Sequence, residues 1–489
     1  MEKEDEAAVA ILDANTENEH LIMLSNGQLP SNKRDRQDYH HHSFLHTSTS
    51  RNDTERLLQG NDSDSDEELA APPMIMPKRR RKCLAADKRK HCCCFHTRKA
   101  CLFVCLLAIL VPLASFGIFS SVYFSPVSLP SIPATNDNHQ DAVSTPLTAN
   151  PRLLTFNMFM RPPGVKNNEN DYKDERLDYI IKRILPLYDI ITIQEAFAYA
   201  NRRIDKLLVA AFDQGFYFHV ESPRHYPWDL GGDGGLLILS RYPITKADRI
   251  EFSRGVHADW LSFKGALHAL VEVGDNQFIH VYTTHTQASY DNGGKLNLDD
   301  TKVRLSQFAK VHQFIQDTAQ NDAFPILLMG DLNVDAAIHN GSLPDAPSYK
   351  SSLAYTMMMD VLTGQGTNLT LLGGDTFDKL LYTSSWRLDN LTDVPYETFG
   401  YHPVTFGDYT RSPNGTLLPA ETILTSHNQL LTVQSIDRLL WAAGRSHQNH
   451  TMMALSNITI EHFSVDKNAT YPFTQISDHY GISAILNIK

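Results

Sequence analysis

The sequence predicts an α/β domain from Pro151 to Lys489, and two observations support this class. Short apolar runs bounded by glycine, proline or polar residues are typical of buried strands. Longer segments with apolar residues three or four positions apart are typical of helices. The two kinds of segment alternate without a regular strand–helix–strand rhythm. The sequence contains neither a Walker loop nor a dinucleotide-binding fingerprint, so it does not predict either of those nucleotide-binding folds.

Residues 1–99 form a polar and charged tail that is predicted to be disordered and cytosolic. An acidic run, Asp62–Glu68, is followed by a basic run, Lys78–Lys82. Such a composition buries too little apolar surface to offset the entropy of ordering the chain. Two acidic-dileucine patterns, Glu17–Ile22 and Asp53–Leu58, resemble sorting signals, although patterns this short also arise by chance.

All the cysteines precede the globular domain, which therefore has no disulfide framework. A domain of this size is expected to fold on its hydrophobic core alone. The run Cys92–Cys94 lacks the spacing of zinc ligands, and its position beside an apolar segment favours acylation. The cysteines are Cys83, Cys92, Cys93, Cys94, Cys101 and Cys105.

Residues 100–124 are apolar and uncharged over a length that crosses a bilayer as one helix. Ten Lys or Arg residues lie between Lys78 and Lys99, whereas the first basic residue beyond the apolar run is Arg152. By the positive-inside rule, a type II single-pass topology is expected, with the domain at the cell surface or in the lumen of endolysosomes. Residues 125–150, rich in Pro, Ser and Thr, are expected to form a stalk.

Seven Asn-x-Ser/Thr sequons lie within the last 150 residues of the chain. They agree with that orientation, because glycosylation takes place on the lumenal side of the secretory membranes. The predicted glycosylation sites are Asn340, Asn368, Asn390, Asn414, Asn449, Asn457 and Asn468.

Regular elements are predicted along the whole domain. Strands are expected at Leu153–Asn157, Ile190–Gln194, Leu236–Leu239, His268–Val273, Phe278–Thr284, Ile326–Met329 and Ile482–Ile488. Helices are expected at Asp174–Leu187, Ala198–Phe212 and Lys302–Thr318. The segment Asn340–Gln434 is rich in Gly, Asn, Thr and Asp, and it is expected to form long loops.

Polar residues suited to bind a phosphate or a hard cation follow several of the predicted strands. Asp331 and Asn333 come after Ile326–Met329, and residues two apart in an extended backbone share a face. An Asx turn would explain the same pair without any site. Asn157 and Glu195 end two other strands and offer the oxygen ligands that Mg²⁺ prefers. A glutamate after a strand is also a common solvated cap.

The remaining candidates are a lysine–aspartate pair and two histidines. Asp259 and Lys264 are close in sequence, which suits either a site or a surface ion pair. His285 follows the strand Phe278–Thr284, where a lone histidine is often structural. Asp478 and His479 precede the last strand, and a carboxylate that orients an imidazole makes it a better general base.

Taken in chain order, these residues resemble the motifs of the endonuclease/exonuclease/phosphatase superfamily. The matching residues are Asn157, Gln194–Glu195, Ser240–Pro243, Gly330–Asn333, Ser435–Asp437 and Ser477–His479. The resemblance covers about residues 152–489. It implies a four-layer α/β/β/α sandwich of the DNase I-like type. It also implies hydrolysis of phosphate esters with Mg²⁺, or with Mn²⁺ as an alternative ion.

Three details resemble the neutral sphingomyelinase branch, and the secreted bacterial enzymes in particular. These details are Thr284–Ala288, Asp259 with Lys264–Gly265, and Ser477–Gly481. The inositol phosphatases differ, because they carry a tryptophan before the Gly-Asp pair, where this chain has Met329. The resemblance implies that sphingomyelin in a membrane is the substrate, and that ceramide and phosphocholine are the products.

The resemblance further implies a base and a metal site. His479 is expected to act as the general base, oriented by Asp478. Glu195 and Asn157 are expected to hold Mg²⁺, which would contact a phosphate oxygen and the leaving oxygen.

The other implied roles concern the phosphate. Asp331 and Asn333 are expected to position water and phosphate. His285 and Lys264 are expected to donate to the developing charge, with Asp259 holding Lys264.

Two alternatives remain beside the sphingomyelinase reading, namely a membrane-anchored nuclease of the same fold and a non-catalytic ectodomain. Residues 151–489 carry 28 Lys and Arg against 37 Asp and Glu, a net charge of −9, which disfavours nucleic acid as a partner. Tyr226–Trp228 and Tyr471–Phe473 are candidates for contact with a lipid bilayer, although either could equally belong to the core.

Overall fold

The computed structural model describes residues 91–132, 147–289, 297–338, 348–368, 380–444, 453–465 and 470–488. The predicted tail as far as residue 90, residues 133–146 of the stalk, and the sequons at Asn340, Asn449 and Asn468 lie outside these residues. Within the described part, α1 (His91–Phe124) is the one helix that is long and apolar enough to cross a membrane, over Lys99–Phe124. That segment coincides with the predicted span.

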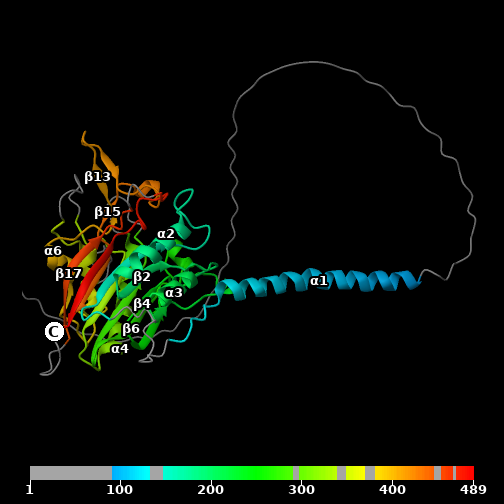
Figure 1. Ribbon diagram of the computed structural model, residues 1–489, viewed down its shortest axis with the longest axis horizontal. Helices are drawn as coiled ribbons and strands as arrows, with labels where there is room; N and C mark the ends of the chain where they lie inside the picture. Colours follow the sequence, from blue (N-terminus) through cyan, green and yellow to red (C-terminus); the bar gives the residue numbers. More distant parts are fainter. Residues whose placement is uncertain are drawn as a thin grey trace, which may run out of the picture. The chain divides into compact units, whose positions relative to one another are not determined.

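Two six-stranded mixed sheets form the centre of the domain (Figure 1). In each sheet one parallel pair, β1–β2 or β7–β8, lies among antiparallel neighbours. The first sheet has the order β17 (Met453–Glu461), β18 (Gly481–Ile488), β1 (Arg152–Met160), β2 (Ile190–Ala196), β4 (Leu237–Ser240) and β3 (Phe218–Glu221). The second has the order β11 (Leu391–Asp393), β16 (Asp437–Ala442), β8 (Ile326–Asp331), β7 (Gln277–His285), β6 (Gly265–Gly274) and β5 (Ile244–Glu251).

Strand β8 is apolar without a break from Ile326 to Met329 because both of its faces are buried. Leu327 and Met329 belong to the core between the two sheets. Ile326 and Leu328 point the other way, into the core beneath the helices. A strand with one solvated face would instead alternate apolar and polar residues.

Helices cover the outer face of each sheet. On the first sheet lie α2 (Lys173–Tyr179), which continues as a π-helical turn over Ile180–Ile184, and α3 (Arg203–Asp213). On the second sheet lie α4 (Leu298–Ala319) and α5 (Leu353–Leu362). The order of helix, sheet, sheet and helix is the predicted four-layer sandwich, which is therefore confirmed.

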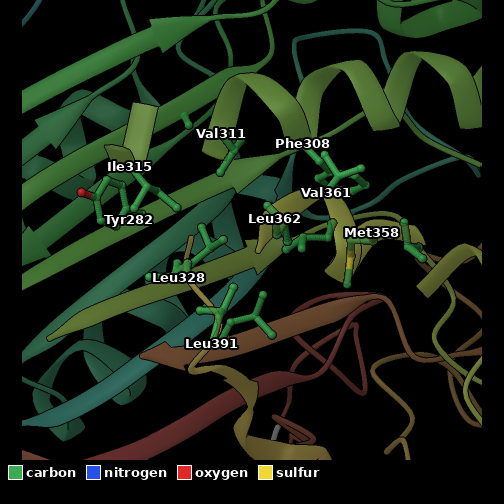
Figure 2. Close-up of a cluster of buried hydrophobic side chains, with 14 of the residues drawn as sticks. Tyr282, Phe308, Val311, Ile315, Leu328, Met358, Val361, Leu362 and Leu391 are labelled. Atoms are coloured by element: carbon green, nitrogen blue, oxygen red, sulfur yellow. The ribbon is translucent and has the colours of Figure 1, made fainter. Parts of the chain in front are cut away.

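The core beneath α4 and α5 is drawn in Figure 2. Phe308 and Val311 of α4 and Val361 of α5 pack above Leu328 of β8. Both helices start at a side-chain cap, because Asn297 accepts hydrogen bonds at the start of α4 and Ser352 does so for α5.

All the predicted strands and helices are present, although several of their ends differ. The helix expected from Ala198 begins at Arg203, whose backbone N–H donates to the side chain of Asn201. The expectation of loops over Asn340–Gln434 was wrong in part, because α5, β11 and α6 (Val394–Phe399) lie there. The remaining short elements are η2 (Leu185–Leu187), η3 (Pro227–Asp229), η4 (His257–Leu261), β9 (Thr367–Asn368), β10 (Leu380–Leu381), β12 (Phe406–Gly407), β13 (Tyr409–Arg411), β14 (Leu417–Pro419), η6 (His427–Gln429) and β15 (Val433–Gln434).

Candidate active site

Polar side chains gather where the central strands of both sheets end. Glu195, His285 and Asp331 stand at the carboxyl ends of the parallel strands β2, β7 and β8. Asp437 begins the antiparallel strand β16, and His479 lies just before β18. Pairing of β8 with its neighbours sets Asp331 beside both His285 and Asp437. The topology thus brings residues far apart in sequence to one edge of the sandwich, where open α/β sheets bind their ligands.

Asp331 is the centre of this group. Its Oδ2 accepts a hydrogen bond from Nδ2 of Asn157 at 3.1 Å and lies 3.5 Å from Nε2 of His285. Its Oδ1 accepts a hydrogen bond from the backbone N–H of Asn333 at 3.0 Å. Nε2 of His479 is 3.9 Å from the same Oδ2. Four of the residues predicted from the sequence therefore contact or approach one buried carboxyl group.

The carboxyl group of Asp331 is hard to ionise in this environment. Burial raises its pKa to about 7, and the neighbouring Asp437 adds to the rise. His479, Lys264 and the hydrogen bond from Asn157 act in the opposite direction. A carboxyl group with this pKa is only partly ionised near neutral pH.

The carboxylate that orients His479 is Asp437, and not Asp478 as expected from the sequence. Nδ1 of His479 lies 3.0 Å from Oδ2 of Asp437. Burial by itself would lower the pKa of His479, but Asp437, Asp331 and Asp478 outweigh that effect and raise the pKa to about 10. Without a cation among these carboxylates, His479 is an imidazolium at neutral pH.

Asp478 faces another group, the carboxylate of Glu195. Burial, opposed by His479 and helped by the nearby Glu195, raises the pKa of Asp478 to about 6. Oε2 of Glu195 is buried and has no hydrogen-bond partner among the described residues. The backbone of Glu195 is left-handed, with φ of 52°, a conformation that costs free energy and is often found at functional sites.

Lys264 adds a positive charge to the site. Its Nζ donates to Oδ2 of Asp259 at 2.9 Å and to the carbonyl oxygen of Thr286 at 2.7 Å. The same Nζ lies 3.1 Å from Nε2 of His285. Burial, followed by the charges of Lys264 and His479, holds the pKa of His285 well below its usual value. His285 is therefore neutral, and its Nε2 can accept a hydrogen bond from the ammonium group of Lys264.

The backbone around Asn333 is fitted closely to β7. Asn333 has φ of 51°, and its Nδ2 donates to the carbonyl oxygen of Thr286 at 3.0 Å. Gly330 has φ of 147°, and a Cβ atom there would collide with the carbonyl oxygen of Thr284. Glycine is needed at this position because the two strands approach so closely.

Arg176, which sequence reasoning missed, connects the two segments that carry Asn157 and His479. Its guanidinium group is fully buried and donates to the carbonyl oxygens of Met158 at 3.0 Å, Phe159 at 2.8 Å and Ile476 at 2.7 Å. Ser477 adds a direct link, because its Oγ donates to the carbonyl oxygen of Asn157 at 2.6 Å.

Two sets of residues offer ligands to a metal ion. Asp331, Asp437 and His479 have donor atoms within 4.8 Å of one another, so this buried group could hold a metal. Glu195 and Asn157 are expected from the sequence to bind Mg²⁺. They lie on the neighbouring strands β2 and β1, where Asn157 is paired with Gln194, the residue before Glu195. Their donors are oxygens, which suit a hard cation.

Comparison with known proteins gives a family match and several relatives. The model of the endonuclease/exonuclease/phosphatase family matches residues 154–479. A sphingomyelinase of Dictyostelium discoideum is 26% identical over 70% of this chain and the full length of that protein. Sphingomyelinase C of Bacillus cereus is 26% identical over 45% of this chain and 65% of its own length.

Solved structures give a similar set of neighbours. The beta toxin of Staphylococcus aureus matches 68% of this chain and 99% of its own, with a TM-score of 0.42 and 20% identity. Sphingomyelinase C of Streptomyces griseocarneus matches 69% of this chain and 99% of its own, with a TM-score of 0.41 and 20% identity. The curated relatives agree with the branch that the sequence motifs resemble.

Proposed function

Because the chain belongs to the endonuclease/exonuclease/phosphatase family, we propose that it hydrolyses sphingomyelin to ceramide and phosphocholine. The names of its relatives support this substrate, since proteins similar over 45% to 70% of the chain are sphingomyelinases. The observation that carries the proposal is the buried pair of His479 and Asp437 beside Asp331. This arrangement places a candidate base beside the carboxyl group of Asp331, with the positive charge of Lys264 next to His285, which approaches the same carboxyl group.

In the proposed reaction, Nε2 of His479 takes a proton from a water molecule while that water attacks phosphorus. Asp437 holds Nδ1 of the ring and stabilises the imidazolium that forms. The bond between phosphorus and the ceramide oxygen breaks, and the ceramide oxygen takes up one proton, which balances the proton that His479 removed from the attacking water. Phosphocholine keeps the oxygen of the attacking water.

Lys264, His285 and Asn333 are proposed to bind the phosphate. The ammonium group of Lys264 is held by Asp259 and supplies positive charge where negative charge develops. Nδ1 of His285 is buried and has no hydrogen-bond partner in the described part of the chain. Because Nε2 accepts from Lys264, Nδ1 carries the proton and is available to donate.

Mg²⁺ fits the residues of this site. Oε2 of Glu195 lacks a partner among the described residues, Asp478 lies near it, and both are hard oxygen donors. We therefore propose Glu195 and Asn157 as the Mg²⁺ ligands, with Mn²⁺ as an alternative ion and Asp478 as a nearby carboxylate. A bound Mg²⁺ would polarise a phosphate oxygen and offset the charge that keeps His479 protonated.

The proposed topology places the domain where its substrate is. A type II orientation, with α1 in the membrane and the glycosylated domain at the cell surface or in endolysosomes, exposes the site to the leaflet that is rich in sphingomyelin. The apolar segment Lys99–Phe124 supports an anchor, and the basic residues before it support the orientation.

The direct test compares substrates. The full chain, purified in detergent, should release phosphocholine from mixed micelles containing sphingomyelin when Mg²⁺ is present. It should act much more slowly on phosphatidylcholine and on plasmid DNA. Faster nicking of plasmid DNA than cleavage of sphingomyelin would replace the proposal by the nuclease alternative of the same family.

A further inference from the structure

Four large apolar side chains on two turns are exposed to solvent. Trp228 and Leu230, at and just after η3, are 61% and 68% exposed. Trp260 and Leu261, at the end of η4, are 48% and 60% exposed. We call these four residues the docking surface. Exposed apolar groups gathered in this way mark a binding surface more often than single exposed residues do.

Backbone hydrogen bonds join the two turns. The N–H of Gly232 donates to the carbonyl oxygen of Leu261 at 2.8 Å. The N–H of Phe263 donates to the carbonyl oxygen of Gly232 at 3.0 Å. The docking surface is therefore one unit, although its two halves are about thirty residues apart in sequence.

Arg254 fixes the same two turns from behind. One guanidinium nitrogen donates to the carbonyl oxygen of Trp260 at 2.8 Å, and another donates to that of Asp229 at 2.8 Å. The guanidinium carbon lies 3.6 Å from the centre of the Phe263 ring. These contacts connect both turns to one side chain, and the apolar side chains of the turns remain exposed.

We propose that the docking surface inserts into the face of the bilayer in which α1 is anchored. Tryptophan prefers the interface between the headgroups and the acyl chains, and leucine prefers the hydrocarbon below it. Phe124, the last residue of α1, is buried against Tyr199 and Tyr226, with ring centres 4.9 Å and 6.1 Å away. Tyr226 in turn stacks on Trp228 at 4.7 Å. The anchor and the docking surface are thus linked by continuous aromatic contacts.

The docking surface is also linked to the site. Asp259, in η4, accepts a hydrogen bond from Nζ of Lys264 at 2.9 Å, and Lys264 also contacts His285. The turn that enters the membrane surface is therefore the turn that holds the phosphate-binding lysine. This inference rests on the proposed lipid substrate and deepens it, because it states how a headgroup in the bilayer reaches the site.

Tryptophan fluorescence tests the insertion directly, without any enzyme activity. The four tryptophans are Trp228, Trp260, Trp386 and Trp441, and none lies in α1. The full chain in nanodiscs of phosphatidylcholine with brominated acyl chains should show clear quenching relative to ordinary lipid. The double variant Trp228→Phe and Trp260→Phe should lose most of that quenching. Its remaining fluorescence comes from Trp386 and Trp441, which are not part of the docking surface.

Equal quenching in the double variant and in the unaltered chain would overturn the proposal. Absence of quenching in the unaltered chain would overturn it as well. If fluorescence then changed with the number of chains per nanodisc, a second copy of the chain would be the occupant of the docking surface. Because this measurement uses no substrate, its result stands even if sphingomyelin is not hydrolysed.

Activity provides the second test. Leu230→Ser with Leu261→Ser should lower turnover of sphingomyelin in nanodiscs by about tenfold, since two apolar contacts with lipid are lost. Turnover of water-soluble p-nitrophenyl phosphocholine should stay within about twofold, because the site itself is unchanged. The matched control, Leu187→Ser with Leu418→Ser, alters two leucines of comparable exposure elsewhere and should leave both activities unchanged. An equal loss on both substrates would show damage to the site and overturn the proposal.

Discussion

Nδ1 of His479 lies 3.0 Å from Oδ2 of Asp437, although the two residues are 42 positions apart in sequence. Pairing of β16 with β8 sets Asp437 directly beside Asp331 in the second sheet, and His479 reaches Asp437 from the segment before β18 of the first sheet. Two buried carboxylates side by side repel each other, and the imidazolium of His479 stabilises them both. The proposed general base and its orienting carboxylate thus come from segments that belong to different sheets.

Substitutions at this pair should remove turnover. We expect His479→Ala and Asp437→Asn each to lower turnover of sphingomyelin by about 10²- to 10⁴-fold, because the first removes the base and the second its orientation. Phosphocholine release measures the effect. The two changes combined should cost little more than the larger single effect, since the residues act as one unit. Near-normal turnover of His479→Ala would disprove the assignment of the base.

Removal of metal should stop the reaction, and the Mg²⁺ concentration needed for turnover should depend on Glu195. EDTA is expected to abolish turnover, and Mg²⁺ or Mn²⁺ to restore it. Glu195→Gln removes the buried carboxylate that lacks a partner in the described residues, so it should need at least about tenfold more Mg²⁺. The rise in melting temperature on addition of Mg²⁺ should shrink in parallel. Glu397→Gln, on the exposed side of α6, is the control and should behave as the unaltered chain does.

Arg176 should be necessary for the geometry of the site. Arg176→Met keeps the bulk of the side chain but leaves buried carbonyl oxygens of Met158, Phe159 and Ile476 without their donor. Each unsatisfied group costs about 1–3 kcal/mol, so the unfolding free energy should fall by several kcal/mol. Urea denaturation measures this loss. Arg183→Met, at an exposed position of the following π-helical turn, should change stability by less than about 0.5 kcal/mol. Equal stability of the two variants would contradict this account.

The layers of this fold could be predicted from the sequence because most of its strands are buried on both faces. Runs such as Ile326–Met329 are apolar without interruption, and they are recognisable without knowledge of their neighbours. Edge strands are less distinct. Strand β5 (Ile244–Glu251) contains five exposed positions, and its pattern is that of a polar surface segment. The sequence therefore predicts the centre of each sheet better than its edge.

Most residues of the site could be predicted from the sequence, but the contacts between their side chains could not. Asp437 is recognisable as part of a motif, yet only the packing of the two sheets shows that it reaches His479. Asp478 directly precedes His479 in the sequence, so it is the carboxylate that sequence reasoning assigns as the partner of His479. Arg176 gives no signal at all, since an arginine in an amphipathic helix is usually solvated and here its partners are backbone oxygens.

Stability should decline in mild acid because of a buried pair of histidines. Nε2 of His268 lies 2.8 Å from Nδ1 of His280, with Asp248 and Asp322 at the two ends. Burial, with His280 adding, lowers the pKa of His268 to about 4 from its usual value of 6.5. The folded protein therefore binds this proton less readily than the unfolded chain. The contribution of the neutral His268 to the free energy of unfolding is fully present above pH 6.5, and it is lost as the pH drops from there toward 4.

Urea denaturation between pH 7.5 and pH 4.5 measures this effect. His268→Gln should flatten the decline, because the variant has no proton to gain at that position. His427→Gln, at an exposed position of η6, should keep the original slope. If His268→Gln loses stability with acid as steeply as the unaltered chain, other groups cause the decline.

The sequons should report the topology and differ in occupancy. Asn390, Asn414 and Asn457 are exposed, whereas Asn368 lies half-buried in the short strand β9. A domain in the lumen or outside the cell is expected to carry glycans at the three exposed sites and fewer at Asn368. Treatment with an N-glycosidase should increase the gel mobility of the chain. Each change of an exposed asparagine to glutamine should remove one step of that shift, while Asn368→Gln should change little. Protease added to sealed vesicles should spare residues 125–489. Digestion of the domain in intact vesicles, with no glycosidase shift, would reverse the proposed orientation.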